Sequence, residues 1–156
     1  MEILITNECP KINVDIGEIE LQIGKILTTL DCNDHEISIL FIGDHGIRDL
    51  NHQFRGIDRP TDVLSFPQIS DDEPEPPGAP VLGDVAISLE TARQQSEDHG
   101  LSLKEELTLL LIHGILHLLG YDHEISAQEE ERMRKKTREL FEVIYPGKKL
   151  ADTCNF

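Results

Sequence analysis

The 156-residue sequence has no apolar run that approaches the roughly 20 residues of a membrane-spanning helix. Its first residues, MEILITNECP, include an acidic side chain and lack the basic cluster that opens a signal peptide. We therefore expect neither insertion into a membrane nor secretion.

Cysteine is scarce, with only Cys9, Cys32 and Cys154 in the chain. Their number is odd and they lie far apart, which argues against a disulfide framework. None of their spacings is typical of a metal site. Such residues are typical of reduced thiols in a reducing compartment. The sequence therefore predicts a cytoplasmic protein.

Basic residues are also few: 14 lysines and arginines against 30 acidic residues give a formal net charge of −16. This balance argues against non-specific binding to nucleic acid, so no DNA partner is expected. Arg48, Arg55 and Arg59 nevertheless form a local basic stretch. The basic residues in 132–138 are interpreted as a solvated helix face paired with the acidic residues 129–131.

Hydrophobic periodicity predicts strands at residues 2–6, 36–42, 62–66 and 82–88. Helices are expected where a favoured N-cap residue precedes an apolar pattern; the predicted N-caps are Asp15, Asp44, Ser88, Ser102 and Ser126. Residues 67–80, rich in proline, glycine and acid, are expected to form an exposed loop and a passive insertion. Residues 148–156 are expected to be a tail.

Together these elements predict a single domain over residues 1–156 of the α/β (α+β) class. A mixed sheet of about four strands would pack with about five helices, one of them a zincin-like metal helix.

Three histidines give the strongest functional signal. His113, His117 and His123 have the spacing H-x3-H-x5-H, with Gly120 between the last two. The first two lie a little over one helical turn apart and share a face, and a left-handed Gly120 would end the helix and return His123 to the same point. Three imidazoles without a fourth protein ligand are typical of a catalytic zinc site with an open position for water or substrate.

The alternative is that these histidines are ordinary core residues held by hydrogen bonds, because the helix is apolar nearly all round. Two imidazoles on one stripe of a buried helix need partners, however. A single metal ion would satisfy both at once.

The run HGILHLLGYDH, residues 113–123, closely resembles the HExxHxxGxxH pattern of metzincin metalloproteases. Gly114 replaces the glutamate that acts there as general base, so the metal ligands are retained and the base is missing. Glycine costs about 1 kcal/mol in a helix interior relative to alanine. Either a close approach by substrate or backbone, or tight packing of the helix on the sheet, would account for it.

With two further segments, the chain resembles the YbeY family of bacterial metal-dependent endoribonucleases. Residues 51–67, NHQFRGIDRPTDVLSFP, are close to the family's N-x3-R-x4-PTDVLSFP, and residues 82–88, LGDVAIS, match a third segment. The resemblance implies that His113, His117 and His123 hold one zinc ion and that Arg55 belongs to the active site. A guanidinium can hold two non-bridging phosphate oxygens in a bidentate clamp.

The resemblance also implies a function: a zinc-dependent, single-strand-specific endoribonuclease that acts in maturation of the 3′ end of small-subunit rRNA and in ribosome quality control. Its partners would be rRNA, ribosomal particles and ribosomal proteins. His52 and Asp122 are weaker site candidates, and Asp62 and Ser65 are assigned no chemical role.

Two other functions stay open on the sequence. One is a zinc hydrolase of another class, such as a metallopeptidase, which the histidine spacing favours and Gly114 opposes. The other is a non-catalytic ribosome-assembly factor with a structural zinc ion. The metal itself is also open, because three histidines accept nickel, cobalt or copper as well as zinc.

Overall fold

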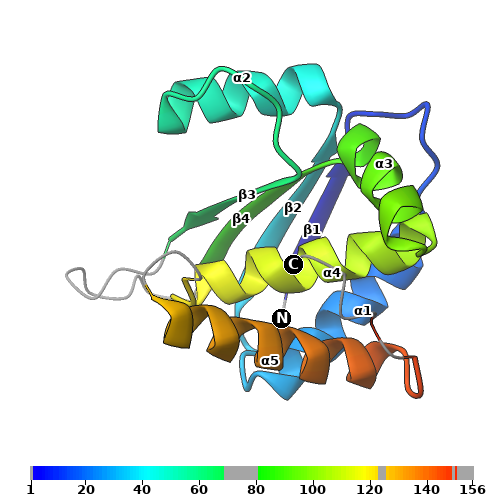
Figure 1. The fold of residues 1–156 in the computed structure, drawn as a ribbon, viewed down its shortest axis with the longest axis vertical. Helices are drawn as coiled ribbons and strands as arrows, with labels where there is room; N and C mark the ends of the chain where they lie inside the picture. The colour runs from blue at the N-terminus through cyan, green and yellow to red at the C-terminus, as the bar shows by residue number, and fades with distance from the viewer. Residues whose placement is uncertain (1, 69–80, 123–125, 149, 151–156) are drawn as a thin grey trace.

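A four-stranded mixed sheet forms the centre of the computed structural model, which describes residues 2–68, 81–122, 126–148 and 150 (Figure 1). The strand order is β1-β2-β4-β3. β1 (Glu2–Asn7), β2 (Glu36–Ile42) and β4 (Val81–Ser88) run parallel. β3 (Val63–Pro67) pairs antiparallel with β4 and forms one edge of the sheet. The predicted mixed sheet of four strands is confirmed.

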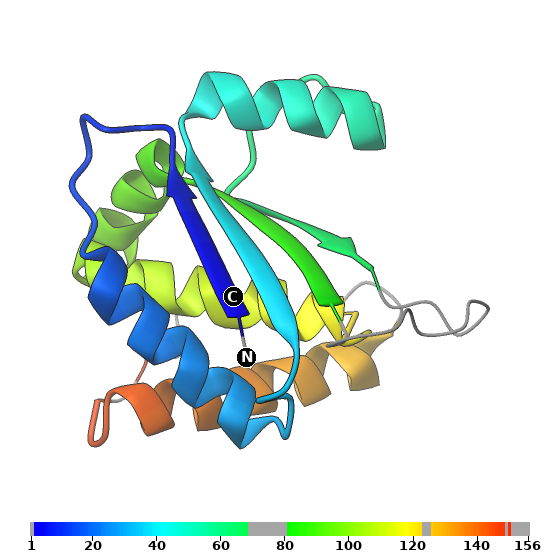
Figure 2. The ribbon, with the colours of Figure 1, turned by 180° about the vertical axis from the view of Figure 1, so that it is seen from behind.

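Helices cover both faces of this sheet, as the two opposite views show (Figures 1 and 2). α4 (Leu103–Leu118) lies across one face, with α1 (Ile16–Thr29), α3 (Leu89–His99) and α5 (Ala127–Ile144) around it. α2 (Asp44–Arg55) packs on the other face. None of the described helices combines the length and apolarity that a bilayer crossing requires.

Strand alternation divides the apolar side chains between two cores. Ile37, Ile39 and Phe41 of β2 face the helix layer with Val85 and Ile87 of β4. The intervening positions, including Ile42, Leu64 and Ala86, contact Ile47 of α2. α4 is buried over most of its surface, as its apolar sequence predicts.

Four of the five predicted N-caps are confirmed. The side chains of Asp15, Ser88, Ser102 and Ser126 each accept a hydrogen bond from the main-chain N–H three residues later. Ser102 also completes a capping box with Glu105.

The prediction that Asp44 is an N-cap is wrong. Gly43 is the N-cap of α2, and Asp44 is the first helical residue. The Asp44 carboxylate instead accepts hydrogen bonds from Ser88 Oγ (2.6 Å) and Thr91 Oγ1 (2.5 Å). This carboxylate therefore joins α2 to the start of α3 rather than capping its own helix.

Two expectations for irregular segments need correction where the structure describes them. Pro67 belongs to β3, and the N–H of Gln68 still donates to Leu82 O (3.0 Å), so the predicted loop begins later than residue 67. Residues 69–80 lie outside the described part. In the predicted tail, Leu150 is only 7% exposed and joins the main core.

At Gly114, α4 packs closely against the sheet. A Cβ atom at this position would lie 2.6 Å from Val85 Cγ1 and 3.4 Å from Ser65 Oγ. Ser65 Oγ also donates a hydrogen bond to Gly114 O (2.9 Å). Tight packing of helix on sheet is therefore the explanation that the structure supports for this glycine.

We predict that Gly114→Ala destabilises the protein by about 1–3 kcal/mol, because overpacking against Val85 outweighs the roughly 1 kcal/mol that alanine gains in helix propensity. Denaturant unfolding measures the change. Gly17→Ala is the matched control, since its Cβ would meet only Asp15 Oδ1 at 3.6 Å. That variant should be neutral or slightly stabilised, and equal behaviour of the two variants would contradict the packing explanation.

Candidate functional site

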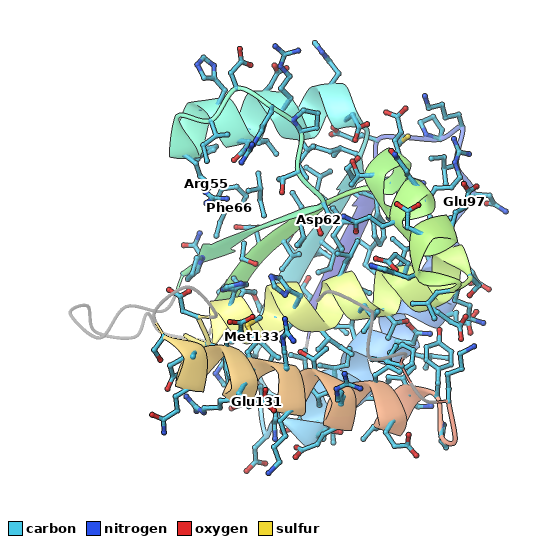
Figure 3. The ribbon with its side chains drawn as sticks, viewed as in Figure 1. Arg55, Asp62, Phe66, Glu97, Glu131 and Met133 are labelled. Atoms are coloured by element: carbon cyan, nitrogen blue, oxygen red, sulfur yellow. The ribbon has the colours of Figure 1, made fainter. Side chains whose placement is uncertain are left out.

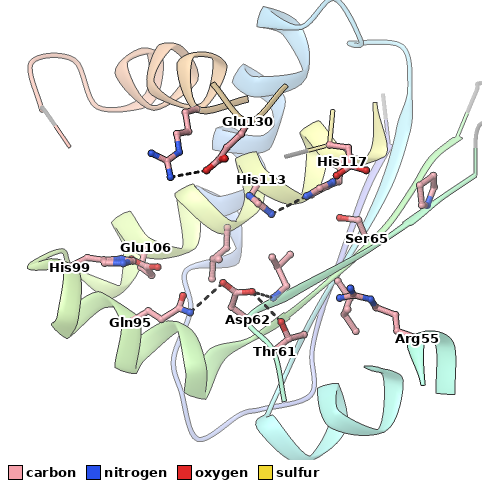
Figure 4. Close-up of a pocket in the computed structure, with 16 residues that line it drawn as sticks. Arg55, Thr61, Asp62, Ser65, Gln95, His99, Glu106, His113, His117 and Glu130 are labelled. Atoms are coloured by element: carbon pink, nitrogen blue, oxygen red, sulfur yellow. Dashed lines mark hydrogen bonds and ion pairs between the residues drawn. The ribbon is translucent and has the colours of Figure 1, made fainter. Parts of the chain in front are cut away.

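A cleft of about 540 Å³ runs along α4, beside the edge strand β3 and the first turns of α5 (Figure 4). Its lining residues come from five elements, the segment before β3 and the turn after α4: Arg55, Thr61, Asp62, Val63, Leu64, Ser65, Pro67, Gln95, His99, Glu106, Leu110, His113, His117, Asp122, Glu130 and Arg134. The cleft thus unites Arg55 with two predicted metal ligands. His52 is exposed and lies outside it.

His113 and His117 converge inside this cleft. Their Nε2 atoms are 3.0 Å apart, and their ring planes meet at 68° with centroids 4.5 Å apart. Both side chains are half-buried on an otherwise buried stretch of α4. The predicted placement of this pair on one face of a helix is confirmed.

This pair fits a shared metal ion. Two nitrogens at about 2.0–2.1 Å from one tetrahedral zinc ion would be about 3.3 Å apart, close to the observed separation. The same separation suits a hydrogen bond between neutral imidazoles, so the two rings are arranged for either state. Both histidines also have further interactions beyond this contact.

The position of the third predicted ligand, His123, lies outside the described residues. The turn that leads to it is described: Gly120 has a φ of +95°, and the Tyr121 N–H donates to Leu116 O (3.0 Å). The helix therefore ends where the sequence predicts. Within residues 2–68, 81–122 and 126–148, no group of three histidine, cysteine or acidic side chains is arranged for a metal ion.

Arg55 is the last residue of α2 and extends toward the cleft beside β3 (Figures 3 and 4). Gly56, with a φ of +71°, ends the helix directly after it. The buried Asn51 donates from Nδ2 to Arg59 O (2.9 Å), which ties the last turn of α2 to the segment that leads into β3. The asparagine of the N-x3-R pattern thus fixes the segment that follows the arginine.

Of the basic stretch around Arg55, one member is already engaged. Arg48 Nε donates to Asp58 Oδ1 (2.8 Å), and this bond lowers the pKa of the Asp58 carboxyl. The structure gives Arg55 no hydrogen bond or ion pair within the residues it describes. Its guanidinium therefore remains available to a ligand in the cleft.

The cleft is also lined by a buried carboxylate that the sequence analysis did not identify. Glu106 is 2% exposed, and its Oε2 atom lies 2.8 Å from His99 Nδ1. Burial raises the pKa of the Glu106 carboxyl, although the His99 hydrogen bond acts against that rise. Beside it, Gln95 Nε2 donates to Asp62 Oδ2 (3.3 Å).

A signal for Glu106 was present in the sequence. It precedes His113 by seven residues, which is about two helical turns, so it lies on the histidine face of an otherwise apolar helix. His99 and Gln95 had no comparable signal, because they reach the cleft only through the packing of α3 on α4.

Two of the basic residues of α5, Arg132 and Arg134, pair with acidic residues of its first turn, as the sequence interpretation proposed. Arg132 contacts Glu129 (3.2 Å) and Arg134 contacts Glu130 (3.0 Å). The Glu130–Arg134 pair lies at the cleft wall. These arginines therefore add little uncompensated positive charge to the cleft.

Comparison with known proteins gives one consistent family. The family model described as Endoribonuclease YbeY matches residues 4–145. A protein named Endoribonuclease YbeY from Syntrophus aciditrophicus is 39% identical over 146 residues, which cover 93% of this chain and 91% of the relative. Its namesake from Persephonella marina is 46% identical over 142 residues, or 91% and 92% of the two chains.

A solved structure agrees in fold. The solution structure of TM1509 from Thermotoga maritima superposes with a TM-score of 0.63 at 27% identity, and the match covers 95% of this chain and 99% of that one.

Because the Glu106 pKa is raised in the folded state, its contribution to stability is fully present below the ordinary carboxyl pKa and is lost as pH rises through the raised pKa. We predict that Glu106→Gln, which stays neutral, is stabilised relative to the wild type at neutral pH and that this gain disappears in acid. Thermal unfolding over a pH series measures it.

Glu105→Gln on the same helical turn is the control of opposite sign. Burial acts to raise the pKa of Glu105, but hydrogen bonds from Ser102 and the Lys148 ammonium lower it overall. Its stabilising effect is present above the ordinary carboxyl pKa and lost in acid, so the glutamine variant should be destabilised at neutral pH. A neutral-pH loss for both variants would contradict the assignment for Glu106.

Proposed function

The chain belongs to the YbeY family of endoribonucleases, and from that premise we propose that it cleaves single-stranded ribosomal RNA in a metal-dependent reaction. It is an endoribonuclease, a hydrolase that acts on phosphodiester bonds. The identity of the metal, the ribosomal substrate and the ribosomal partners are parts of this proposal.

One observation carries the proposal: the converging Nε2 atoms of His113 and His117 share a cleft with the Arg55 guanidinium. Cleavage of a phosphodiester bond builds negative charge on the non-bridging oxygens. Arg55 can accept that charge with two parallel N–H donors. A cation held by the histidines would face the same phosphoryl group.

In this proposal His113, His117 and His123 would hold one zinc ion, which would supply Lewis-acid polarisation of a phosphoryl oxygen or of water. Arg55 binds and orients the scissile phosphate. The α4–β3 wall shields one side of the reacting group from bulk water, because Leu110 and Val63 contribute apolar surface there. The neutral rings of the histidine pair must present their Nε2 lone pairs to the cation.

A metallopeptidase has weaker support. Position 114, which holds the general base in metzincins, faces Val85 at a distance that leaves no room for a glutamate side chain. A non-catalytic assembly factor does not agree with membership of an enzyme family.

We further propose that ribosomal particles and ribosomal proteins bring the enzyme to its substrate, because a net charge of −16 repels bare RNA at long range. Such a substrate would place the protein in the cytoplasm. The buried free thiols of Cys9 and Cys32 accord with a reducing compartment.

We predict that His117→Ala loses most of its bound metal and that cleavage of a defined single-stranded rRNA precursor falls by roughly 100-fold or more, since a main source of charge stabilisation is removed. Elemental analysis and product gels measure the two effects. His45→Ala is the control, because His45 is exposed on α2 outside the cleft. Cleavage that persists unchanged in the His117 variant would point to a contaminating nuclease.

We predict that Arg55→Ala lowers kcat/KM by roughly 100-fold and that Arg55→Lys recovers only part of this loss, because lysine keeps the charge but not the planar pair of donors. Metal content should stay unchanged in both. Arg48→Gln, which removes an arginine already paired with Asp58, serves as the matched control. Full activity of the lysine variant would exclude a bidentate clamp.

A further inference from the structure

The edge strand β3 presents its main chain to the cleft. Its residues pair with β4 in the register Leu64–Ala86 and Phe66–Asp84. Two hydrogen bonds at the ends of this pair show which residues of β3 bond to β4. They run from Ser88 N to Asp62 O (2.9 Å) and from Gln68 N to Leu82 O (3.0 Å). In an antiparallel pair such bonds occur at every second residue. Val63, Ser65 and Pro67 therefore direct their main-chain groups away from β4.

Of these three outward positions, only one offers a main-chain donor to a ligand. Pro67 has no N–H, and the N–H of Val63 donates to Asp62 Oδ1 (2.8 Å). The Ser65 N–H has no acceptor in the ranges that the structure describes. The open edge thus carries one N–H donor at its centre.

The cleft reaches this edge. Residues 61–65 all line it, although side chains of successive strand residues point to opposite faces of a sheet. A continuous run of lining residues therefore means that the strand's main chain forms part of the wall. Figure 4 shows Ser65 between His117 and Arg55. The bond from Ser65 Oγ to Gly114 O holds the strand against α4 at this height.

We propose that the Ser65 main-chain N–H is a phosphate anchor, which donates a hydrogen bond to a non-bridging oxygen of the scissile phosphodiester while Arg55 binds the same group. This inference rests on the proposed function. An extended peptide is a poor occupant of the edge, because strand addition needs alternating donors and acceptors and Pro67 interrupts them. A phosphodiester needs donors alone, and the adjacent guanidinium matches its charge.

The test compares Ser65→Pro with Ser65→Ala. Both variants lose the Oγ bond to Gly114, and only proline loses the N–H. Proline is tolerated at outward edge positions, as Pro67 in the same strand shows. We expect kcat/KM on single-stranded RNA to be roughly 10- to 100-fold lower for the proline variant than for the alanine variant. The loss should fall mainly on kcat, with equal metal content and similar thermal unfolding.

A measurement on the wild type decides the matter if the proline variant does not fold. The metal-loaded protein is titrated with a single-stranded 2′-O-methyl oligonucleotide, and amide resonances are followed by NMR. We expect a downfield shift of the Ser65 amide proton. Phe66 is the internal control, because its N–H is directed toward β4.

The outcomes separate this inference from the proposed function. If the wild type neither cleaves nor binds single-stranded RNA, the proposed function fails and the anchor with it. If the wild type cleaves RNA but the two Ser65 variants have equal kcat/KM, the anchor alone is overturned. The anchor alone is also overturned if the Ser65 amide resonance does not shift on saturation with the oligonucleotide.

Discussion

The close contact between α4 and the sheet at Gly114 is the constraint on which the site depends. The absence of a side chain there lets the helix approach Val85, and the Ser65 hydroxyl then bonds the Gly114 carbonyl. His113 immediately precedes this contact, and His117 follows one turn later. The histidine pair is therefore placed by core packing, with each buried leucine of α4 contributing about 1.5–3 kcal/mol. The geometry of the histidine pair is therefore a consequence of a well-packed interior.

Local signals predicted most of the architecture. Strand and helix positions followed from apolar periodicity, and four N-caps followed from single polar residues that precede an apolar pattern. The histidine pair was predictable because its spacing is a property of one helix. Asp44 shows the limit of local signals. Its carboxylate is a suitable N-cap by residue type, but it accepts hydrogen bonds from the hydroxyls of Ser88 and Thr91 instead. Those partners are more than 40 residues away in sequence.

The rest of the site could not be predicted, because it also depends on contacts between residues of separate elements. The pairing of His99 with Glu106 requires α3 to pack on α4, and the role of Asn51 requires the chain to return beside its own helix. Ser65 lies in segment 51–67, which resembles the family pattern, but nothing in that pattern indicated a role for its main chain. The proposed role of Ser65 belongs to its main-chain N–H. The direction of that N–H depends on strand order and register, which cannot be predicted from the identity of the side chain.

The acidic character of the cleft limits how it can bind RNA. The cleft holds the carboxylates of Asp62, Glu106, Asp122 and Glu130 in a chain of net charge −16, so a broad positive surface is not what binds the substrate. In the proposed site, the Ser65 main-chain N–H and the Arg55 guanidinium would recognise a phosphate without attracting nucleic acid in general, because few counterions would be released. Such a site discriminates well and holds RNA weakly. Affinity must then come from elsewhere, which is the physical argument for a ribosomal partner that delivers the strand.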